Sequence, residues 1–154
     1  KQKQDVSVCG NIKNQDYLDI CYKEVGVAKK DITICNNIES YDHKSLCITG
    51  VAAAKQELSI CEELDYGLVE FCYEKVGIAK KDVGVCDKII QNEGWKNDCY
   101  ISVATYKQDS SVCDKIQIEY VRDQCYRDVG KARKDIDICN KIKTHHLKDE
   151  CKND

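Results

Sequence analysis

The sequence has no proline and no methionine, and it contains a single phenylalanine and a single tryptophan. The absence of proline means that the usual helix-breaking residue is missing from the whole chain. The scarcity of large apolar side chains among 154 residues excludes a conventional bulky core as the main source of stability. The apolar fraction is nevertheless 42%, which is typical of a folded protein.

Long apolar runs and an excess of one charge are also missing. No stretch of the sequence is apolar over 18 residues, so the sequence predicts no membrane-spanning helix. Lys and Arg number 24 against 27 Asp and Glu, and the two signs are interleaved along the chain. Because no large positive field results, the composition argues against a nucleic-acid partner.

Cysteine is abundant instead, with 12 residues, about 8% of the chain, which borders on the range of disulfide scaffolds. The even number permits complete pairing and favours an oxidising compartment, with a reduced, buried set as the alternative. The chain begins at Lys1 and has no Met, which is expected of a chain that has lost a leader peptide or of a fragment. We therefore expect an extracellular or cell-surface protein.

The cysteines recur with a fixed period. The first members of successive pairs are 26, 26, 25, 27 and 26 residues apart, whereas each second cysteine precedes the next first cysteine by 14 residues every time. This periodicity predicts a single repeat domain over residues 1–154. Its six repeats are expected at residues 5–30, 31–56, 57–81, 82–108, 109–134 and 135–154.

Each first cysteine lies in a phrase such as "DITICNNI" or "DVGVCDKI". The apolar residues before and three after the cysteine share a helical face, and the leading Asp is a favoured N-cap residue, so the phrase predicts a short helix of two to three turns. Only Glu57 replaces Asp at this cap.

Around the second cysteine, Leu18, Cys21, Val25 and Ala28 follow the spacing of a longer helix with one buried stripe. Tyr106 takes the place of the last alanine in one copy, which predicts looser packing there. Glycine recurs five residues after the cysteine, which indicates the close approach of a neighbouring helix. These glycines are Gly26, Gly77 and Gly130. The sequence thus predicts an all-α fold, an α-solenoid of six disulfide-stapled helical hairpins.

Hairpin geometry favours one pairing of the cysteines. The two cysteines of one repeat lie about equally far from the hairpin tip, where their Cβ atoms can come within bonding reach. The alternative register joins Cys21 to Cys35 and continues along the chain, and sequence alone leaves it open. The favoured pairs are Cys9–Cys21, Cys35–Cys47, Cys61–Cys72, Cys86–Cys99, Cys113–Cys125 and Cys139–Cys151.

Signatures of catalysis and of metal or cofactor binding are missing. The chain has no Cys-x-x-Cys, and His43, His145 and His146 lie in or near the expected hairpin tips without a third ligand. Every cysteine has an equivalent in another repeat, which does not suit a catalytic nucleophile. We therefore expect neither an enzyme nor a cofactor or metal site.

Aromatic residues are the candidates for contact with a partner. A tyrosine directly follows the second cysteine at Tyr22, Tyr73, Tyr100 and Tyr126. A stacked tyrosine row binds a protein or a glycan, or else it covers the flank of the next repeat. Trp95, in the longest expected tip, is a fifth candidate. The lysines before each Asp cap, such as Lys29 and Lys30, form a ladder for a polyanion or simply complement the helix dipole, and the second interpretation is favoured.

The two ends of the sequence motivate a functional hypothesis. The last repeat stops at "CKND", and the chain begins with "KQKQD", which is similar to the internal "AKQE" and "YKQD". Complementary ends predict an exported structural subunit that stacks head to tail with itself into an extracellular filament or surface appendage. The alternatives are a secreted monomeric solenoid that binds a surface protein or glycan through its repeat face, and one section of a larger surface protein.

The phrases "DIDICNKI" and "RDQCYRDVGKA" resemble the short cysteine-bearing helical repeats of uncharacterised proteins predicted to be exported in archaea. The resemblance covers all six copies, although the motif is short and mostly a packing signature. It implies a surface location and no particular activity. Glu57 at the cap and Tyr106 at the small position depart from the pattern.

Overall fold

The computed structural model of the chain describes residues 6–153, apart from the side chain of Tyr66. Every regular element among these residues is helical, which confirms the predicted all-α class. The elements are η1 (Val6–Asn11), α1 (Gln15–Lys29), α2 (Ile32–Cys35), α3 (Tyr41–Lys55), η2 (Leu58–Glu63), α4 (Tyr66–Lys80), α5 (Val83–Cys86), α6 (Glu93–Lys107), η3 (Ser110–Lys115), α7 (Glu119–Arg133), α8 (Ile136–Asn140) and α9 (His145–Lys152).

Each repeat pairs a short helix around its first cysteine with a longer helix around its second. The short helices span four to six residues, which is about two turns in the 3₁₀ helices and little more than one turn in the α-helices, against the predicted two to three. They are 3₁₀ helices in the first, third and fifth repeats and α-helices in the others. A helix this short gains little from its own hydrogen bonds. It therefore depends on its N-cap and on its link to the longer helix.

Six disulfides supply that link. They join the pairs that hairpin geometry favours, and the register that joins Cys21 to Cys35 is not adopted. The Cα atoms of each pair are 5.6 to 5.8 Å apart, within the usual range for a disulfide. All 12 cysteines are paired in this way, so the predicted architecture of six stapled hairpins is confirmed.

Each long helix that is followed by another repeat ends at a residue with a left-handed backbone conformation. In the first repeat this residue is Lys30, with φ of 57°, and the next amide, that of Asp31, donates to the carbonyl of Gly26 at 3.0 Å. This is the Schellman arrangement, which fixes the chain direction between a helix and the segment after it. Its rigid geometry explains the constant spacing of 14 residues. The residues in this conformation are Lys30, Gln56, Lys81, Gln108 and Lys134.

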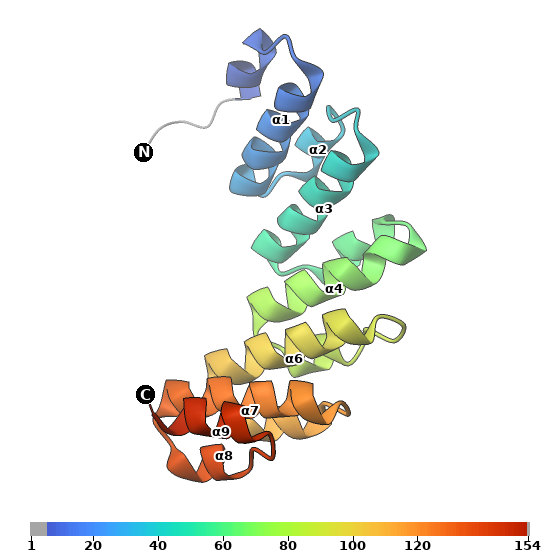
Figure 1. Cartoon of the computed structure of the whole chain (residues 1–154). Coiled ribbons are helices and arrows are strands. Elements are labelled where there is room, and N and C mark those ends of the chain that lie inside the picture. Colours follow the sequence, from blue (N-terminus) through green and yellow to red (C-terminus); the bar gives the residue numbers. More distant parts are fainter. Residues whose placement is uncertain (1–5, 154) are drawn as a thin grey trace. The chain divides into compact units, whose positions relative to one another are not determined.

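The chain divides into two compact units, residues 1–80 and 81–154, which are described separately. Within the first unit, α1 contacts α3 and α3 contacts α4, and within the second, α6 contacts α7 and α7 contacts α9 (Figure 1). Each long helix followed by another repeat of its unit also contacts the short helix of that repeat. Hairpins therefore stack in chain order within each unit, as in a solenoid. The prediction of one domain over the whole chain stays a prediction.

In the first and the fifth repeat, the glycine five residues after the second cysteine packs against the next disulfide. A Cβ atom on Gly26 would lie 3.0 Å from Sγ of Cys47, and one on Gly130 would lie 2.7 Å from Sγ of Cys151. The expected close neighbour is thus present, but it is a sulfur atom of the following hairpin rather than a helix backbone. Ala52 and Ala104 take the same position in the second and fourth repeats and are fully buried there.

The predicted buried stripe of the long helices ends one turn early. Val25 is buried, as are its equivalents in the later repeats, but Ala28 is exposed near the end of α1. Tyr106, three positions beyond Val103 in α6, is 63% exposed, and Nζ of Lys81 lies 3.4 Å from its ring centroid. The side chain of Tyr106 therefore lies at the surface, outside the core. The looser packing that was expected around it does not arise, because the ring is not packed between helices.

Two buried aspartates tie neighbouring hairpins together. Asp19 in α1 accepts hydrogen bonds from the amides of Glu39 and Ser40 at 3.2 and 2.9 Å, and Ser40 is the N-cap of α3. Asp123 in α7 accepts from the amides of Lys143 and Thr144 in the same way. Sequence analysis missed both residues. The available signal was an acid two residues before the second cysteine in every odd repeat, at Asp19, Glu70 and Asp123.

The hydrogen bonds that Asp19 accepts from the amides of Glu39 and Ser40 predict a pH-dependent contribution to stability. Burial raises the pKa of Asp19, but the amides of Ser40 and Glu39 and the side chain of Gln15 outweigh it, and the pKa lies below the ordinary 3.8. The carboxylate therefore stabilises the fold fully above about pH 4, and this contribution is lost as the pH falls through the lowered pKa. Asp19→Asn should lower the free energy of unfolding by about 1–3 kcal/mol at pH 7.

Thermal unfolding of the wild type and Asp19→Asn at pH 7 and pH 2 measures this effect. The difference in Tm should shrink at pH 2, where the native carboxyl is also neutral. Glu24→Gln, an exposed acid on the same helix, is the matched control and should change Tm little at either pH. An equal loss of Tm for Asp19→Asn at both pH values would contradict a stabilising role for the charge of the Asp19 carboxylate.

The caps of the short helices predict a stabilising substitution. Asp31, Asp82, Asp109 and Asp135 each accept a hydrogen bond from the amide two residues later. Glu57 has the same extended backbone, with φ of −106° and ψ of 111°, but its side chain makes no cap bond. Asp5, the expected cap of the first repeat, lies outside the described residues.

Glu57→Asp should therefore raise the free energy of unfolding by about 0.5–1 kcal/mol, measured by guanidinium titration. The exposed ion pair of Glu57 with Lys55, at 2.9 Å, contributes too little to reverse the sign. Asp31→Glu is the reciprocal control and should be destabilising. If Asp31→Glu lowers the free energy of unfolding while Glu57→Asp leaves it unchanged, the missing cap hydrogen bond at Glu57 does not limit the stability of the fold.

Candidate binding groove between α3 and α4

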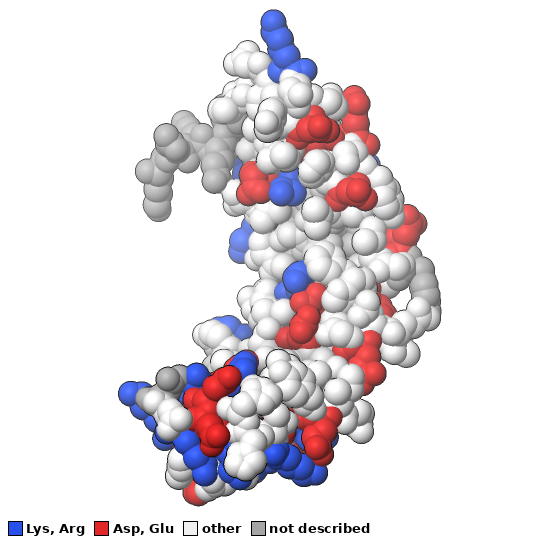
Figure 2. Space-filling view, in the orientation of Figure 1, with Lys and Arg blue, Asp and Glu red and all other residues white. Residues whose placement is uncertain are grey.

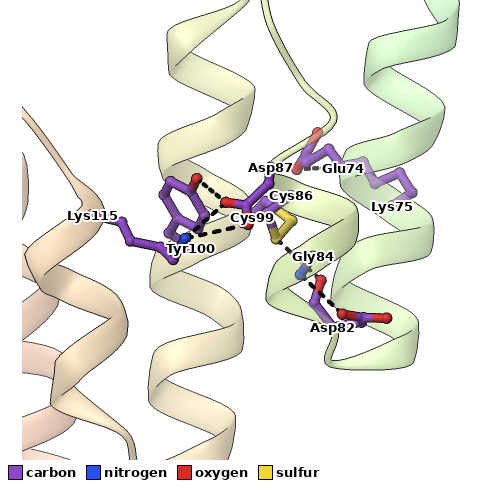
Figure 3. Close-up of a disulfide and its surroundings, with 9 residues drawn as sticks. All are labelled: Glu74, Lys75, Asp82, Gly84, Cys86, Asp87, Cys99, Tyr100 and Lys115. Carbon is purple, nitrogen blue, oxygen red and sulfur yellow. Dashed lines mark hydrogen bonds and ion pairs between the residues drawn. A yellow bond between two sulfur atoms is a disulfide. The ribbon is translucent and has the colours of Figure 1, made fainter.

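Two of the predicted contact tyrosines are buried in their own hairpins. Tyr100 and Tyr126 are only 4% and 6% exposed. The hydroxyl of Tyr100 donates to Asp87 at 2.5 Å, as Figure 3 shows, and that of Tyr126 donates to Asp114. A buried tyrosine needs such an acceptor. Tyr100 and Tyr126 therefore lie within the packing of the repeats, because Asp87 and Asp114, directly after the first cysteines of their hairpins, accept the hydroxyl hydrogen bonds. A partner contact through these two tyrosines stays a prediction.

Lysines from the following hairpins lie beside these tyrosine–aspartate pairs. Nζ of Lys115 lies 3.1 Å from the carboxylate of Asp87 and 5.8 Å from the ring centroid of Tyr100 (Figure 3). Burial and the hydrogen bond to Asp114 raise the pKa of Tyr126 to about 12, so its hydroxyl stays protonated at neutral pH. Each tyrosine thus helps to join one hairpin to the next, which is a structural role.

The other three predicted contact residues are half-buried. Tyr22 and Tyr73 pack against the core of the second and third hairpins. Trp95 lies not in the hairpin tip that the sequence predicts but in the first turn of α6. Its amide donates there to the N-cap residue Asn92 at 3.1 Å. A partner contact through Tyr22, Tyr73 or Trp95 stays a prediction, although none of them forms an exposed platform.

The histidines and acids do not assemble a metal site in the described part of the chain. His43 is half-buried in α3, and His145 and His146 are exposed on α9. No group of three His, Cys, Asp or Glu side chains within residues 6–153 has the arrangement of metal ligands. Nor does any helix in this range combine the length and the apolar character that crossing a bilayer requires.

An open apolar groove lies between α3 and α4 in the first unit. It consists of two adjoining hollows, of about 490 and 370 Å³, which share Leu46, Thr49 and Phe71. We call this continuous feature the α3–α4 groove. Its first hollow is lined by Tyr41, Asp42, Ser45, Leu46, Thr49, Asp65, Gly67, Leu68 and Phe71. Its second hollow is lined by Leu46, Thr49, Gly50, Ala53, Phe71, Lys75, Ile78 and Ala79.

Residue size explains why the groove forms. On α3, Ser45, Thr49 and Ala53 follow one another at intervals of four and present small side chains. Leu46 and Phe71, from the two helices, stand beside this row as the large side chains. Gly50 also lets α1 approach α3, because a Cβ atom there would lie 2.5 Å from Cγ2 of Val27. The long helices are thus fixed in position while the surface between α3 and α4 stays hollow.

Charge is distributed unevenly along the groove. Asp42 and Asp65 lie in the first hollow, whose lining contains no Lys or Arg. The hydroxyl of Tyr41 donates to Asp65, and this hydrogen bond raises the pKa of Tyr41. Lys75 lies in the second hollow, with Nζ 4.8 Å from the ring centroid of Phe71 and 2.9 Å from Glu74. The groove therefore has an acidic end and an apolar middle.

The large apolar side chains of this groove are not repeated at the equivalent positions of the second unit. The residue before the second cysteine is Ile20, Leu46 and Phe71 in the first three repeats but Asp98, Gln124 and Glu150 in the last three. A hollow of about 430 Å³ in the second unit is lined mainly by polar side chains, including Glu93, Lys96, Asn97 and Lys115. The apolar side chains of the α3–α4 groove are therefore not a feature of every repeat. Aligning the repeats on their cysteines would have revealed the difference, which sequence analysis missed.

The groove is accessible from solvent. Leu46 is 45% exposed and Tyr41 is 55% exposed, although both are large side chains. On the face shown in Figure 2, positive and negative side chains are interspersed, as the interleaved sequence predicts. Comparisons of the chain with protein-family models, with curated proteins and with solved structures give no match, and the resemblance to exported archaeal repeat proteins stays a prediction.

Proposed function

We propose that the protein is an extracellular binding module that holds an apolar segment of a partner in the α3–α4 groove. The observation that carries this proposal is the apolar groove between α3 and α4, whose Leu46 and Phe71 are replaced by Asp98 and Gln124 at the equivalent positions of the fourth and fifth repeats. A concave apolar surface with a few polar groups at its rim is the usual form of a binding site. This is the binding alternative of the sequence analysis, with a different surface.

The disulfides support both the location and the mode of binding. Six intramolecular disulfides suit an oxidising environment outside the cytosol. Two of them fasten the hairpins that contain α3 and α4. A groove between stapled helices is formed before the partner arrives, which lowers the entropic cost of binding.

Chemical-shift mapping with apolar fragments tests the proposal. Indole and cyclohexanol, added at millimolar concentrations to the labelled full chain, should shift the amide resonances of α3 and α4 and leave those of α6 and α7 unchanged. Leu46→Asp/Phe71→Gln, which installs the side chains of the second unit, should abolish the shifts. Because Leu46 is exposed and Phe71 is half-buried at the surface, the variant should stay folded, as its Tm reports.

A reciprocal variant is the matched control. Asp98→Leu/Gln124→Phe should create fragment-induced shifts in α6 and α7. Equal shifts over both helix pairs of the wild type, or shifts that survive in Leu46→Asp/Phe71→Gln, would overturn the proposal. Head-to-tail self-assembly stays a separate proposal from the sequence, and sedimentation velocity over a range of concentrations tests it with the same proteins.

A further inference from the structure

We propose that the occupant of the α3–α4 groove is an amphipathic helix of a partner protein, with its basic C-terminal end beside Asp42 and Asp65. This inference rests on the proposed function and specifies the chemistry of the partner. It follows from four properties of the groove, namely its length, its hydrogen-bonding capacity, its row of small residues and its charge.

The length of the groove matches a short helix. Its lining on α3 extends from Tyr41 to Ala53, which at 1.5 Å per residue corresponds to about 18 Å. A helix of about 12 residues, a little over three turns, spans the same distance. The groove is therefore too long for a single inserted side chain and suits a row of them.

The walls of the groove favour a helix over an extended peptide. Both walls are α-helices, whose main-chain groups are bonded within the helix, so there is no sheet edge to which a strand can be added. The hydroxyl of Ser45 already donates to the carbonyl of Tyr41 at 2.8 Å. An extended peptide would bury main-chain amides here without partners, which is costly. A helix satisfies its own main chain before it binds.

The surface relief suits helix packing. Ser45, Thr49 and Ala53 form a row at intervals of four residues, with Leu46 and Phe71 beside it. Helices pack by placing the side-chain ridge of one into such a groove of the other. The occupant therefore needs apolar residues at i, i+4 and i+7 or i+8, which is the anchor pattern of helix-in-groove recognition.

Charge sets the direction of the bound helix. Asp42 and Asp65 give the first hollow a negative rim with no cation in its lining, whereas the second hollow contains Lys75. Lysines and arginines are favoured in the last turn of a helix, because they complement the negative pole of its dipole. Lysines or arginines in that last turn would face Asp42 and Asp65. The bound helix would then run antiparallel to α3 and α4.

Peptide display on the full chain tests this inference. The library consists of 14-residue helix-favouring peptides with apolar residues fixed at i, i+4, i+7 and i+11. Each of the remaining positions carries Ala, Glu, Lys or Arg. Selection uses the wild type, and counter-selection uses Leu46→Asp/Phe71→Gln. The enriched peptides should carry Lys or Arg in their last turn and bind the wild type at least tenfold more tightly than the counter-selection variant.

Charge-reversed peptides measure the direction. A peptide of the same composition with the basic residues moved to its first turn should bind at least tenfold more weakly. Asp42→Lys should remove that preference, whereas Glu24→Lys, an exposed position on α1 outside the groove lining, should preserve it. Unchanged preference in Asp42→Lys would overturn the proposed orientation.

The outcomes separate this inference from the proposed function. If fragments shift the groove amides but no helical peptide is enriched over the variant, the partner is not a helix, and the inference is wrong while the binding groove stands. If neither fragments nor peptides bind, both fail. A wild-type dimer that dissociates in Leu46→Asp/Phe71→Gln would show that a second copy occupies the groove, which also overturns the inference.

Discussion

One disulfide in each hairpin is the constraint on which the structure depends. The short helices have four to six residues, too few to be stable alone, and bulky core residues are scarce. Closing a loop across 11 to 13 residues contributes about 3 kcal/mol by limiting the unfolded chain. The disulfides also fill space, because all of the cysteines except Cys21 are buried. Sulfur thus serves both as a cross-link and as part of the core.

The hairpins are joined to one another by contacts that leave the outer face of each long helix unconstrained. Gly26 packs against the next disulfide, Lys30 turns the chain, and Asp19 holds the next helix N-terminus. None of these contacts involves the residue before the second cysteine. Repeats with the same framework therefore carry Leu46 in one unit and Asp98 in the other. Stability resides in the repeated positions, and the proposed binding specificity would reside in the positions that vary.

Sequence predicted the features that depend on spacing along the chain. The period of 26, the constant 14 and the Asp caps indicated the hairpins, and hairpin geometry favoured the cysteine pairs. Features that depend on contacts between repeats were missed. The burial of Tyr100 requires the acceptor Asp87 and a lysine of the next hairpin, and the groove beside Leu46 requires small residues on α3. Such contacts bring together residues whose distance in the sequence gives no direct signal.

The most direct test of the central claim is proteolytic mapping of the unreduced protein by mass spectrometry. The account predicts six cross-linked fragments, each joining the two cysteines of one hairpin, such as Cys35 with Cys47. Fragments that join Cys21 with Cys35, or free thiols at several of the 12 positions, would contradict it.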